Sequence, residues 1–366
     1  MVLSKTERDM EPDELGMNPG IRDYLDSHGL SIRETGRVTA EHKERYLVRT
    51  ITGEFEAEIT GHLRYKAESR EDFPAVGDWV VISSYDEGLA FIHEVIPRYS
   101  IIKRQAVGRH GDIQVIASNI DYAFIVQAAD RDFNINRLER YLTICHASRV
   151  IPVIILSKTD LISATDLESI VESIRNRIPD IHILPFSNES LEGFESIKTF
   201  IEKGKTYCLL GSSGVGKSTL VNNLTGNEVM KTGQISHSTQ KGRHITSHRE
   251  LTILANGGII IDNPGMREVG ITDNSEGLEI TFDKILALAT ACKFKDCTHT
   301  QETGCRVLDA IEKGEIDWNA YQNYLKMERE KSHFELTLAE KRQKDKAFGK
   351  MFKDYKKNFL QDRFKK

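Results

Sequence analysis

Apolar and polar positions follow two different patterns along the chain, and the change falls near residue 120. Beyond it, short continuous apolar runs, such as Tyr122–Val126 and Pro152–Leu156, are each followed by a stretch with apolar residues at helical spacing. Continuous apolar strands between amphipathic helices indicate a parallel sheet that is covered on both faces. The predicted strands are 122–126, 152–156, 182–185, 205–210 and a hairpin of 250–255 with 258–261, and the predicted helices are 135–148, 164–178 and 191–202.

Residues 36–100 instead alternate apolar and polar positions from one residue to the next. Runs of this kind lie at 44–50, 54–59, 79–83 and 90–96, and turns that contain glycine separate them. This alternation with glycine turns predicts a small antiparallel barrel. The visible strands, with room for a fifth, suit an OB-fold, although the pattern also fits other small barrels.

The composition is that of a globular protein with two or three domains. Its 366 residues are 39% hydrophobic and 29% charged, with a net charge of −5. The first residues, Met1–Asn18, have no apolar core and are not a secretory signal. The longest apolar runs, such as Ile151–Leu156, are too short to cross a bilayer. Five cysteines in such a chain do not indicate a disulfide framework, so we expect a cytoplasmic protein with no membrane partner.

A complete P-loop of the form G-x-x-x-x-G-K-S lies at residues 211–219. An apolar run precedes it and a helical stretch follows it, which is the context that the motif requires. Its glycines let backbone N–H groups face phosphate oxygens, Lys217 reaches the terminal phosphates, and the Ser218 hydroxyl is placed to hold Mg²⁺. The predicted phosphate-binding residues are Gly211, Ser212, Ser213, Gly214, Val215, Gly216, Lys217, Ser218 and Thr219.

A second phosphate-site motif, Asp262-Asn263-Pro264-Gly265, follows the predicted strand at 258–261. In P-loop proteins an acidic residue at this place holds Mg²⁺, and the glycine N–H meets the γ-phosphate. Asp262 is therefore predicted as a Mg²⁺ ligand and Gly265 as a nucleotide contact.

The sequence Ser157-Lys158-Thr159-Asp160 directly follows a predicted strand and resembles the base-reading motif Asn-Lys-x-Asp of GTPases. Asp160 is suited to accept hydrogen bonds from guanine N1–H and N2–H₂, a pair that adenine lacks, and the Lys158 stem can lie along the base. Ser157 stands where Asn is usual, so we expect the bonds of that Asn to be shortened or lost. The alternative interpretation is an ordinary helix cap by Thr159 or Asp160.

The order of these motifs is unusual. A loop at 185–187, which includes Ser187, resembles the segment that closes over guanine O6 through a backbone N–H. Both base-binding segments precede the P-loop and Asp262, whereas in ordinary GTPases they follow. Because the termini of a domain often lie close together, a permuted chain can form the same sheet. The order therefore predicts a circularly permuted GTPase domain.

Three cysteines and one histidine are spaced for a metal site near the C-terminal end, in the pattern Cys292-x₄-Cys297-x-His299-x₅-Cys305. Three thiolates and one imidazole are enough for tetrahedral Zn²⁺, and they leave no open coordination position. The predicted zinc is therefore structural, one ion per chain. The surrounding segment is polar and has little reason to fold without the metal.

The permuted order, the small barrel before it and the Cys/His cluster after it together resemble the ribosome small subunit-dependent GTPase A (RsgA) family. The resemblance implies an OB-fold, a permuted P-loop GTPase domain and a helical zinc domain. It also implies hydrolysis of GTP to GDP and phosphate, stimulated by the 30S ribosomal subunit during its late maturation, with contacts to 16S rRNA and a monomeric chain. The implied division is an N-terminal extension (1–34), an OB-fold RNA-binding domain (35–105), the permuted GTPase domain (115–275), a zinc-binding domain (278–337) and a basic aromatic tail (338–366).

The segment Gly242–Ser247 resembles the switch of this family and places Thr246 as a further Mg²⁺ ligand. Met266 stands where many GTPases have a glutamine that orients the attacking water, so the enzyme alone is expected to be slow. His244 is the candidate for positioning that water, with Lys217 as the other catalytic residue. The alternative is that His244 only contacts phosphate or the partner.

The end of the chain is basic and aromatic. From Glu340 to Lys366 there are eleven Lys or Arg against four Asp or Glu, with aromatic residues at 348, 352, 355 and 359. On a helix these aromatics would share one face, which could pack on the zinc domain or on a ribosomal partner while the lysines contact phosphates.

Two other functions of the protein also stay open: a nucleotide-gated RNA-binding protein with incidental hydrolysis, and a P-loop ATPase or kinase.

Overall fold

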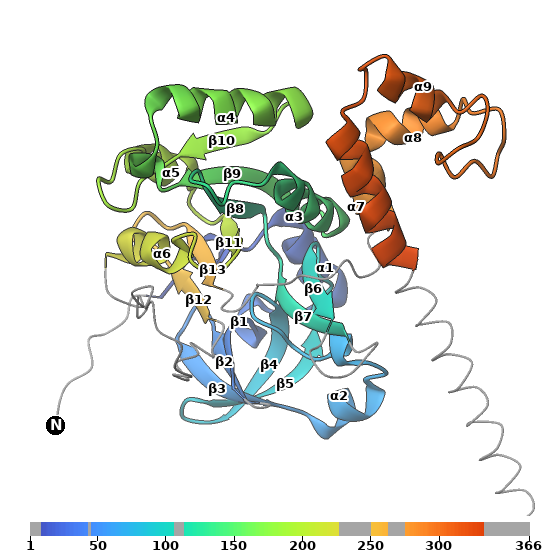
Figure 1. Cartoon of the computed structure of the whole chain (residues 1–366). Coiled ribbons are helices and arrows are strands. Elements are labelled where there is room, and N and C mark those ends of the chain that lie inside the picture. The colour runs from blue at the N-terminus through green and yellow to red at the C-terminus, as the bar shows by residue number, and fades with distance from the viewer. Residues whose placement is uncertain (1–8, 43–44, 106–112, 227–249, 263–274, 333–366) are drawn as a thin grey trace, which may run out of the picture.

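The computed structural model describes residues 9–42, 45–105, 113–226, 250–262 and 275–332, whose arrangement is shown in Figure 1. The expected switch residues His244 and Thr246, together with Gly265, Met266 and the basic tail, lie outside these ranges. Within them, no helix combines the length and the apolar character needed to span a membrane.

The predicted parallel sheet is confirmed and forms the upper part of Figure 1. Its strand order is β10-β9-β8-β11-β13-β12, and the described pairs are parallel apart from β13–β12. In β11, which leads into the P-loop, Cys208 is in register with Ala123 on one side and Ile261 on the other. The strands are β8 (Tyr122–Ala128), β9 (Ile151–Ser157), β10 (His182–Pro185), β11 (Thr206–Leu210), β12 (Glu250–Ile253) and β13 (Ile259–Asp262).

Helices cover both faces of this sheet, which explains why its strands are apolar throughout. Ile125 of β8 packs among residues of α3 and α4, whereas its neighbour Phe124 packs among residues of α5 and α6. Successive side chains of a strand point to opposite faces, so both faces need apolar residues. The helices are α3 (Ile135–Ala147), α4 (Ala164–Arg177), α5 (Phe194–Phe200) and α6 (Lys217–Thr225).

Five of the described strands close into a ring below the sheet. Their order is β1-β2-β3-β5-β4, and β4 pairs back onto β1. Val38, Val48 and Ile92 are among the fully buried residues inside the ring. The four expected runs became β2 to β5, and the additional strand β1 precedes them. The strands are β1 (Thr35–His42), β2 (Arg45–Arg49), β3 (Glu54–Ile59), β4 (Trp79–Asp86) and β5 (Leu89–Val95), with α2 (Gly61–Lys66) and η3 (Arg70–Asp72) between β3 and β4.

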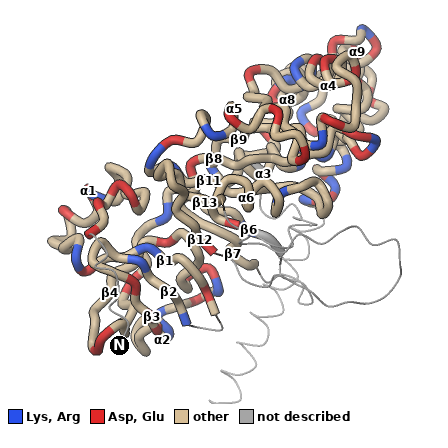
Figure 2. The backbone as a smooth tube through the Cα atoms, turned by 90° about the vertical axis from the view of Figure 1, so that its left-hand side faces the viewer, with Lys and Arg blue, Asp and Glu red and all other residues tan. Residues whose placement is uncertain are grey.

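Strand β1 also joins the ring to the parallel sheet, because Ala40 pairs with Glu250 of β12. Within the described ranges, ring and sheet thus form one 11-stranded sheet. A hairpin of β6 (Ile101–Gln105) and β7 (Ile113–Ser118), which the sequence pattern did not predict, leads from the ring to β8. Figure 2 shows this hairpin on one side of the junction and α1 on the other.

The N-terminal segment packs against the ring. It consists of η1 (Pro12–Leu15), the helix α1 (Pro19–His28) and η2 (Ile32–Glu34). The side chain of Asn18 caps α1 by accepting a hydrogen bond from the Ile21 N–H at 2.9 Å. Leu15 and Ile21 are buried in one cluster with Trp79 of β4, so this segment forms part of a core.

Arg37 of β1 is fully buried where the N-terminal segment, the ring and the parallel sheet meet. Burial lowers the pKa of Arg37, while Tyr99, Asp121 and Asp78 act in the opposite direction. A guanidinium presents its donors in a fixed planar geometry, so its acceptors are held in fixed relative positions. Those acceptors are the carbonyl oxygens of Leu15 (2.7 Å), Gly77 (3.1 Å) and Asn119 (2.9 Å) and the hydroxyl of Thr206 (2.9 Å).

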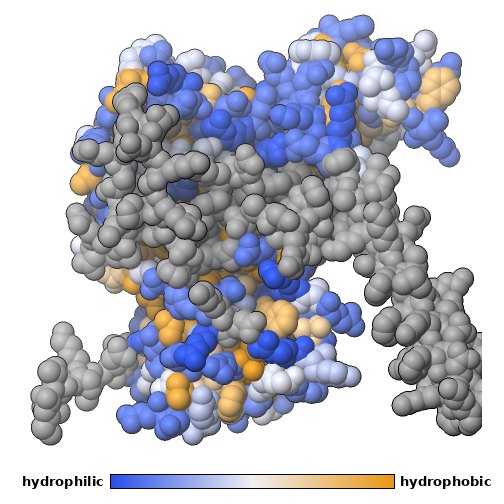
Figure 3. All heavy atoms as spheres, turned by 60° about the horizontal axis from the view of Figure 1, so that its bottom comes forward, coloured by the Kyte–Doolittle hydropathy of each residue, from blue (hydrophilic) through white to orange (hydrophobic). Residues whose placement is uncertain are grey.

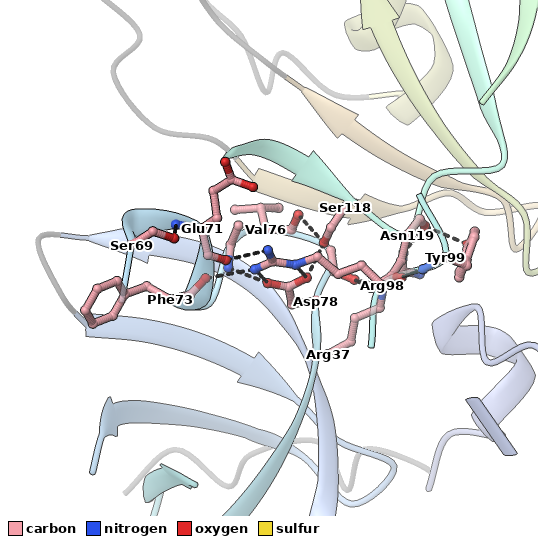
Figure 4. Close-up of polar contacts among 12 residues, drawn as sticks. Arg37, Ser69, Glu71, Phe73, Val76, Asp78, Arg98, Tyr99, Ser118 and Asn119 are labelled. Carbon is pink, nitrogen blue, oxygen red and sulfur yellow. Dashed lines mark hydrogen bonds and ion pairs between the residues drawn. The ribbon is translucent and has the colours of Figure 1, made fainter. Parts of the chain in front are cut away.

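A second polar cluster lies beside Arg37 and connects the ring to the β6–β7 hairpin, as Figure 4 shows. The buried carboxylate of Asp78 accepts two hydrogen bonds from Arg98, at 2.6 and 2.7 Å, and one from the Ser118 hydroxyl at 2.5 Å. Arg98 also donates to the carbonyl oxygens of Glu71 and Phe73. The buried charges at this joint are therefore paired in a bidentate geometry.

The segment around the Cys/His cluster is helical, as expected, and lies at the upper right of Figure 1. Phe282, Val307 and Met327 belong to its own buried core. It approaches α3 closely at Gly277, where an added Cβ would lie 2.1 Å from the Thr143 carbonyl oxygen. Its helices are α7 (Ser275–Thr281), α8 (Asp283–Ala289), α9 (Arg306–Glu312) and a helix at 318–332.

Replacing Arg37 with methionine is expected to lower the free energy of unfolding by about 3 to 5 kcal/mol, because the change leaves buried acceptors without donors. Urea denaturation followed by tryptophan fluorescence measures the loss. Arg33→Met, at an exposed position in η2, is the matched control and should change stability by no more than about 0.5 kcal/mol. Equal, small effects of the two substitutions would show that the Arg37 hydrogen bonds contribute little.

Candidate nucleotide and metal sites

The P-loop lies between β11 and α6, at the carboxyl edge of the parallel sheet. Gly211 has a φ of 148°, and an added Cβ there would lie 2.3 Å from the Val126 carbonyl oxygen. Only glycine therefore lets the loop leave β11 so close to β8. The Lys217 ammonium donates to the carbonyl oxygens of Gly211 and Ser212 at 2.7 and 2.6 Å. These bonds hold its positive charge against the loop, where phosphate oxygens bind in proteins with this motif.

Ser157 connects the predicted base motif to the P-loop. It ends β9, is fully buried, and its hydroxyl donates to the Val215 carbonyl oxygen at 2.6 Å. The sequence led us to expect a shortened or lost contact at this position. Because β9 and the loop approach each other closely, the short serine side chain still makes the contact.

Lys158 directly follows β9 in a left-handed conformation, with a φ of 60°. Its ammonium pairs with Asp130 at 3.2 Å. Burial opposes ionisation of Asp130, but hydrogen bonds from the Asp132 N–H and from Lys158 outweigh burial and hold the pKa of Asp130 below its ordinary value. Sequence reasoning missed Asp130, whose only signal was its position just after strand β8.

The two base-binding segments, 157–160 and 185–187, lie next to each other in the structure. They follow the parallel neighbours β9 and β10 and therefore share one edge of the sheet. The Ser187 hydroxyl donates to the Asp160 carboxylate at 2.5 Å, and the Thr159 N–H donates to the Phe186 carbonyl oxygen at 3.4 Å. The Ser187 N–H donates to the Glu192 carbonyl oxygen at 3.0 Å. In this structure the contribution of Ser187 is thus to orient Asp160 through its hydroxyl.

Asn188 ties the same loop to the P-loop. Its amide nitrogen donates to the Gly216 carbonyl oxygen at 3.3 Å, and its amide oxygen accepts from Asn223 of α6 at 3.4 Å. Gly216 has a φ of 95°, and an added Cβ would lie 2.4 Å from the Asn188 amide nitrogen. Sequence reasoning stopped at Ser187 and missed this next residue.

The predicted magnesium ligands within the described ranges lie at the edge of the sheet that carries the P-loop. Asp262 ends β13, whose residue Ile261 is in register with Cys208 of β11. Ser218 is in the first turn of α6, which directly follows the P-loop. Mg²⁺ prefers oxygen ligands, so the carboxylate of Asp262 and the hydroxyl of Ser218 fit such a site.

Cys292, Cys297, His299 and Cys305 come together as predicted, with their ligand atoms all within 4.8 Å of one another. Cys292 Sγ lies 3.8 Å from Cys305 Sγ and 3.6 Å from His299 Nδ1. Sulfur and nitrogen ligands at the usual distances from tetrahedral zinc would be about 3.8 and 3.6 Å apart. The donor set and its spacing therefore fit zinc.

The surrounding residues hold these ligands in place. Cys305 caps α9, and its sulfur accepts a hydrogen bond from the Leu308 N–H at 3.5 Å. His299 has a left-handed backbone, with a φ of 59°, and its carbonyl oxygen accepts from the Tyr321 hydroxyl. The helix at 318–332 therefore supports the cluster although it supplies no ligand.

Helix α3 contacts both the P-loop and the Cys/His region. Burial raises the pKa of Tyr141, while the nearby side chain of the P-loop residue Ser212 acts in the opposite direction. The buried carboxylate of Glu139 accepts from Arg177 of α4 at 2.6 and 2.8 Å and from Asn323 of the helix at 318–332 at 2.5 Å. Burial raises the pKa of Glu139, although both partners lower it. No sequence motif marked these residues.

Comparison with known proteins agrees with this geometry. Residues 95–272 match the family model described as RsgA GTPase. A protein of Oceanobacillus iheyensis named small ribosomal subunit biogenesis GTPase RsgA 1 is 42% identical over 329 residues, which are 89% of this chain and 92% of that one. The chain belongs to the RsgA GTPase family. It is therefore a GTP-hydrolysing enzyme. An RsgA 1 protein of Bacteroides thetaiotaomicron is 38% identical over 88% of this chain and 90% of its own length.

Solved structures show the same fold. YjeQ from Thermotoga maritima matches 83% of this chain and 98% of its own, with a TM-score of 0.59 at 23% identity. YloQ, described as a circularly permuted GTPase, matches 80% of this chain and 92% of its own, with a TM-score of 0.58 at 24% identity. The circular permutation, which we predicted because the base-binding segments precede the P-loop, is thereby confirmed.

Replacing Ser157 with alanine is expected to weaken GDP binding about 5- to 20-fold, because the buried Val215 carbonyl oxygen loses its donor and the P-loop loses a fixed point. Isothermal titration measures the change. Ser163→Ala, which removes an exposed cap hydroxyl at the start of α4, is the control and should leave affinity within about 2-fold. An unchanged affinity for Ser157→Ala would contradict a role for this bond.

Replacing Cys305 with serine is expected to remove the zinc, about one equivalent per chain, and to unfold the segment around the cluster. Metal analysis gives the zinc content, and amide hydrogen exchange gives the protection of residues 283–332. The strands of the parallel sheet serve as the internal control, since their core contains no residue of the cluster. Full protection of 283–332 in the zinc-free variant would contradict a structural role for the metal.

Proposed function

We propose that this protein hydrolyses GTP to GDP and phosphate in response to the small (30S) ribosomal subunit, during late maturation of that subunit. The observation that carries the proposal is that the base motif is bonded both to the P-loop and to the second base-binding loop: Ser157 donates to Val215, and Ser187 orients Asp160. Relatives that match over nine-tenths of their length are named small ribosomal subunit biogenesis GTPases.

Guanine selectivity follows from Asp160 in this proposal. Its carboxylate accepts hydrogen bonds from guanine N1–H and N2–H₂, and hydrogen bonds to charged acceptors are the stronger ones. The hydroxyl of Ser187 keeps the carboxylate oriented. The pairing of Lys158 with Asp130 holds the lysine stem where it can lie along the base. Thr159 completes the turn between the strand and Asp160.

Phosphate binding and hydrolysis are assigned to the P-loop and the switch residues. The N–H groups of 211–219 and of Gly265 bind the phosphates, and Lys217 stabilises the charge that develops during transfer. Mg²⁺, held by Ser218, Thr246 and Asp262, would supply further positive charge at the β- and γ-phosphates. Since Met266 cannot orient water, His244 takes that role, and ordering of its segment by the ribosome accounts for the stimulation.

We assign the five-stranded ring to the OB-fold class, whose members bind nucleic acid through one face and its loops. Exposed aromatic side chains are the expected partners of unpaired RNA bases. Tyr65 of α2 is 92% exposed, and Tyr85 stacks on Phe91 with ring centroids 4.3 Å apart. Figure 3 shows hydrophobic residues set among hydrophilic ones over the lower part of the molecule, where the ring lies. Arg45 is paired with Glu56 at 2.6 Å, so the β2–β3 face is a poorer phosphate site.

The remaining features of the proposal follow from the same family membership. One structural zinc ion binds Cys292, Cys297, His299 and Cys305. The helices around it, residues 275–332, are called the zinc-binding region and form a second contact to 16S rRNA. The protein acts as a monomer in the cytoplasm, where ribosomal subunits are assembled. The chain divides into the extension, the OB-fold, the GTPase domain, the zinc-binding domain and the tail.

The test is the rate of GTP hydrolysis with and without purified small ribosomal subunits. We expect a rise of at least about tenfold, modest beside the effects of activating partners on other GTPases. His244→Ala should lose this rise while keeping its affinity for GDP. An unstimulated rate would favour a nucleotide-gated RNA-binding protein, and full stimulated turnover of His244→Ala would contradict the role of that histidine.

A further inference from the structure

A cleft of about 850 Å³ separates the GTPase sheet from the zinc-binding region. Residues of α3 form its floor, the end of α4 with the start of β9 and β10 forms one wall, and α7, α8 and residues 315–320 form the other. The helices that contribute to its lining, α3, α4, α7 and α8, are labelled in Figure 1. A cleft of this size is large enough for several side chains of a bound segment.

The two walls of the cleft expose isoleucine side chains. Ile151 is 53% exposed on the GTPase wall and Ile280 is 49% exposed on the zinc-binding wall. Ile178 and Ile181 also line the cleft and are only partly buried. Exposed apolar residues on facing walls of one cleft indicate a surface that another apolar group covers.

The charged groups of the cleft are mostly acidic. Asp180, Asp283 and Glu315 line it, and within the described ranges they form no ion pair. Two basic residues, Arg177 and Lys284, also line the cleft. Arg177 is already engaged, with Glu139 at 2.6 Å and Asp317 at 3.2 Å, so the acidic groups remain in excess. The potential of such a cleft repels phosphate and attracts cationic side chains. It therefore favours a basic segment with apolar anchors over RNA.

We propose that the chain's own basic aromatic tail, residues 338–366, docks in this cleft. Its lysines and arginines would meet the acidic residues, and its aromatic residues would cover the isoleucines of the two walls. Phe348, Phe352, Tyr355 and Phe359 supply the apolar anchors, with lysines between them. Both kinds of complementarity, charged and apolar, are thus present in one segment.

The geometry of the chain permits the tail to reach the cleft. The helix at 318–332 starts beside it, since Asp317 and Ala320 belong to the wall, and its remaining length carries the chain about 18 Å away. The fifteen residues 333–347 span up to about 50 Å, which is enough to bring Phe348 back. Tethering also raises the effective concentration of the tail into the millimolar range.

Photo-cross-linking of the full chain tests the inference. Phe352 is replaced by benzoylphenylalanine, and mass spectrometry locates its cross-links in an equal mixture of light and heavy isotope-labelled protein. We expect cross-links within one chain, to residues 173–182, 280–285 or 315–320. Reversing the cleft charges, Asp180→Lys with Glu315→Lys, should lower their yield at least about 5-fold, as should 1 M salt.

A matched control separates a local effect of charge from a general one. Glu168→Lys with Glu172→Lys introduces the same charge change at exposed positions of α4 that do not line the cleft. This variant should keep the cross-link yield within about 2-fold. Cross-links that map elsewhere, that join light to heavy chains, or that survive the Asp180 and Glu315 reversal unchanged would overturn the proposal.

Discussion

One buried guanidinium sets the relative positions of the main parts of this molecule. Arg37 donates to Leu15, Gly77, Asn119 and Thr206, which belong to the N-terminal segment, the ring, the link into β8 and the P-loop strand. A buried charge without such partners would be strongly destabilising. The acceptors must therefore stay where the planar donor group requires them, and the ring cannot shift without disturbing the strand that carries the P-loop.

Circular permutation leaves the nucleotide site intact because the site depends on which strand ends share an edge and not on their order in the chain. Ser157 and Asp160 follow β9, the P-loop follows β11, and Asp262 ends β13. Parallel pairing brings all of these strand ends to one edge of the sheet. The permuted order places the zinc-binding region directly after the last of these motifs, where it packs against α3.

Sequence patterns predicted the elements that have a local signature. The parallel strands are apolar on both faces, and the P-loop and the Cys/His cluster have fixed spacings. Strand β1 escaped prediction because its buried positions include Arg37 and Thr39, which interrupt the alternation. The Arg37 bonds join residues up to 169 positions apart, and the Asn188 and Glu139 hydrogen bonds cross from one element to another. Such contacts depend on the tertiary fold and leave no period in the sequence.

Hydrogen bonds and an ion pair connect the GTPase sheet to the zinc-binding region, although apolar packing at this joint would give at least as much stability. Glu139 is buried, and burial raises its pKa even though Arg177 and Asn323 bond to it. Desolvation of such a pair offsets much of the attraction, so the pair adds little stability compared with apolar packing. The bidentate pair itself joins α3 to α4, and it fixes the orientation of both side chains. Glu139 then accepts from Asn323, and Arg177 pairs with Asp317, so the bonds that cross the joint start from fixed partners. We infer that these bonds serve to fix how the zinc-binding region sits on α3, the helix whose Tyr141 lies near the P-loop residue Ser212. A displacement of the zinc-binding region would thus act on α3 through Asn323 and on α4 through Asp317, the two helices that cover one face of the GTPase sheet.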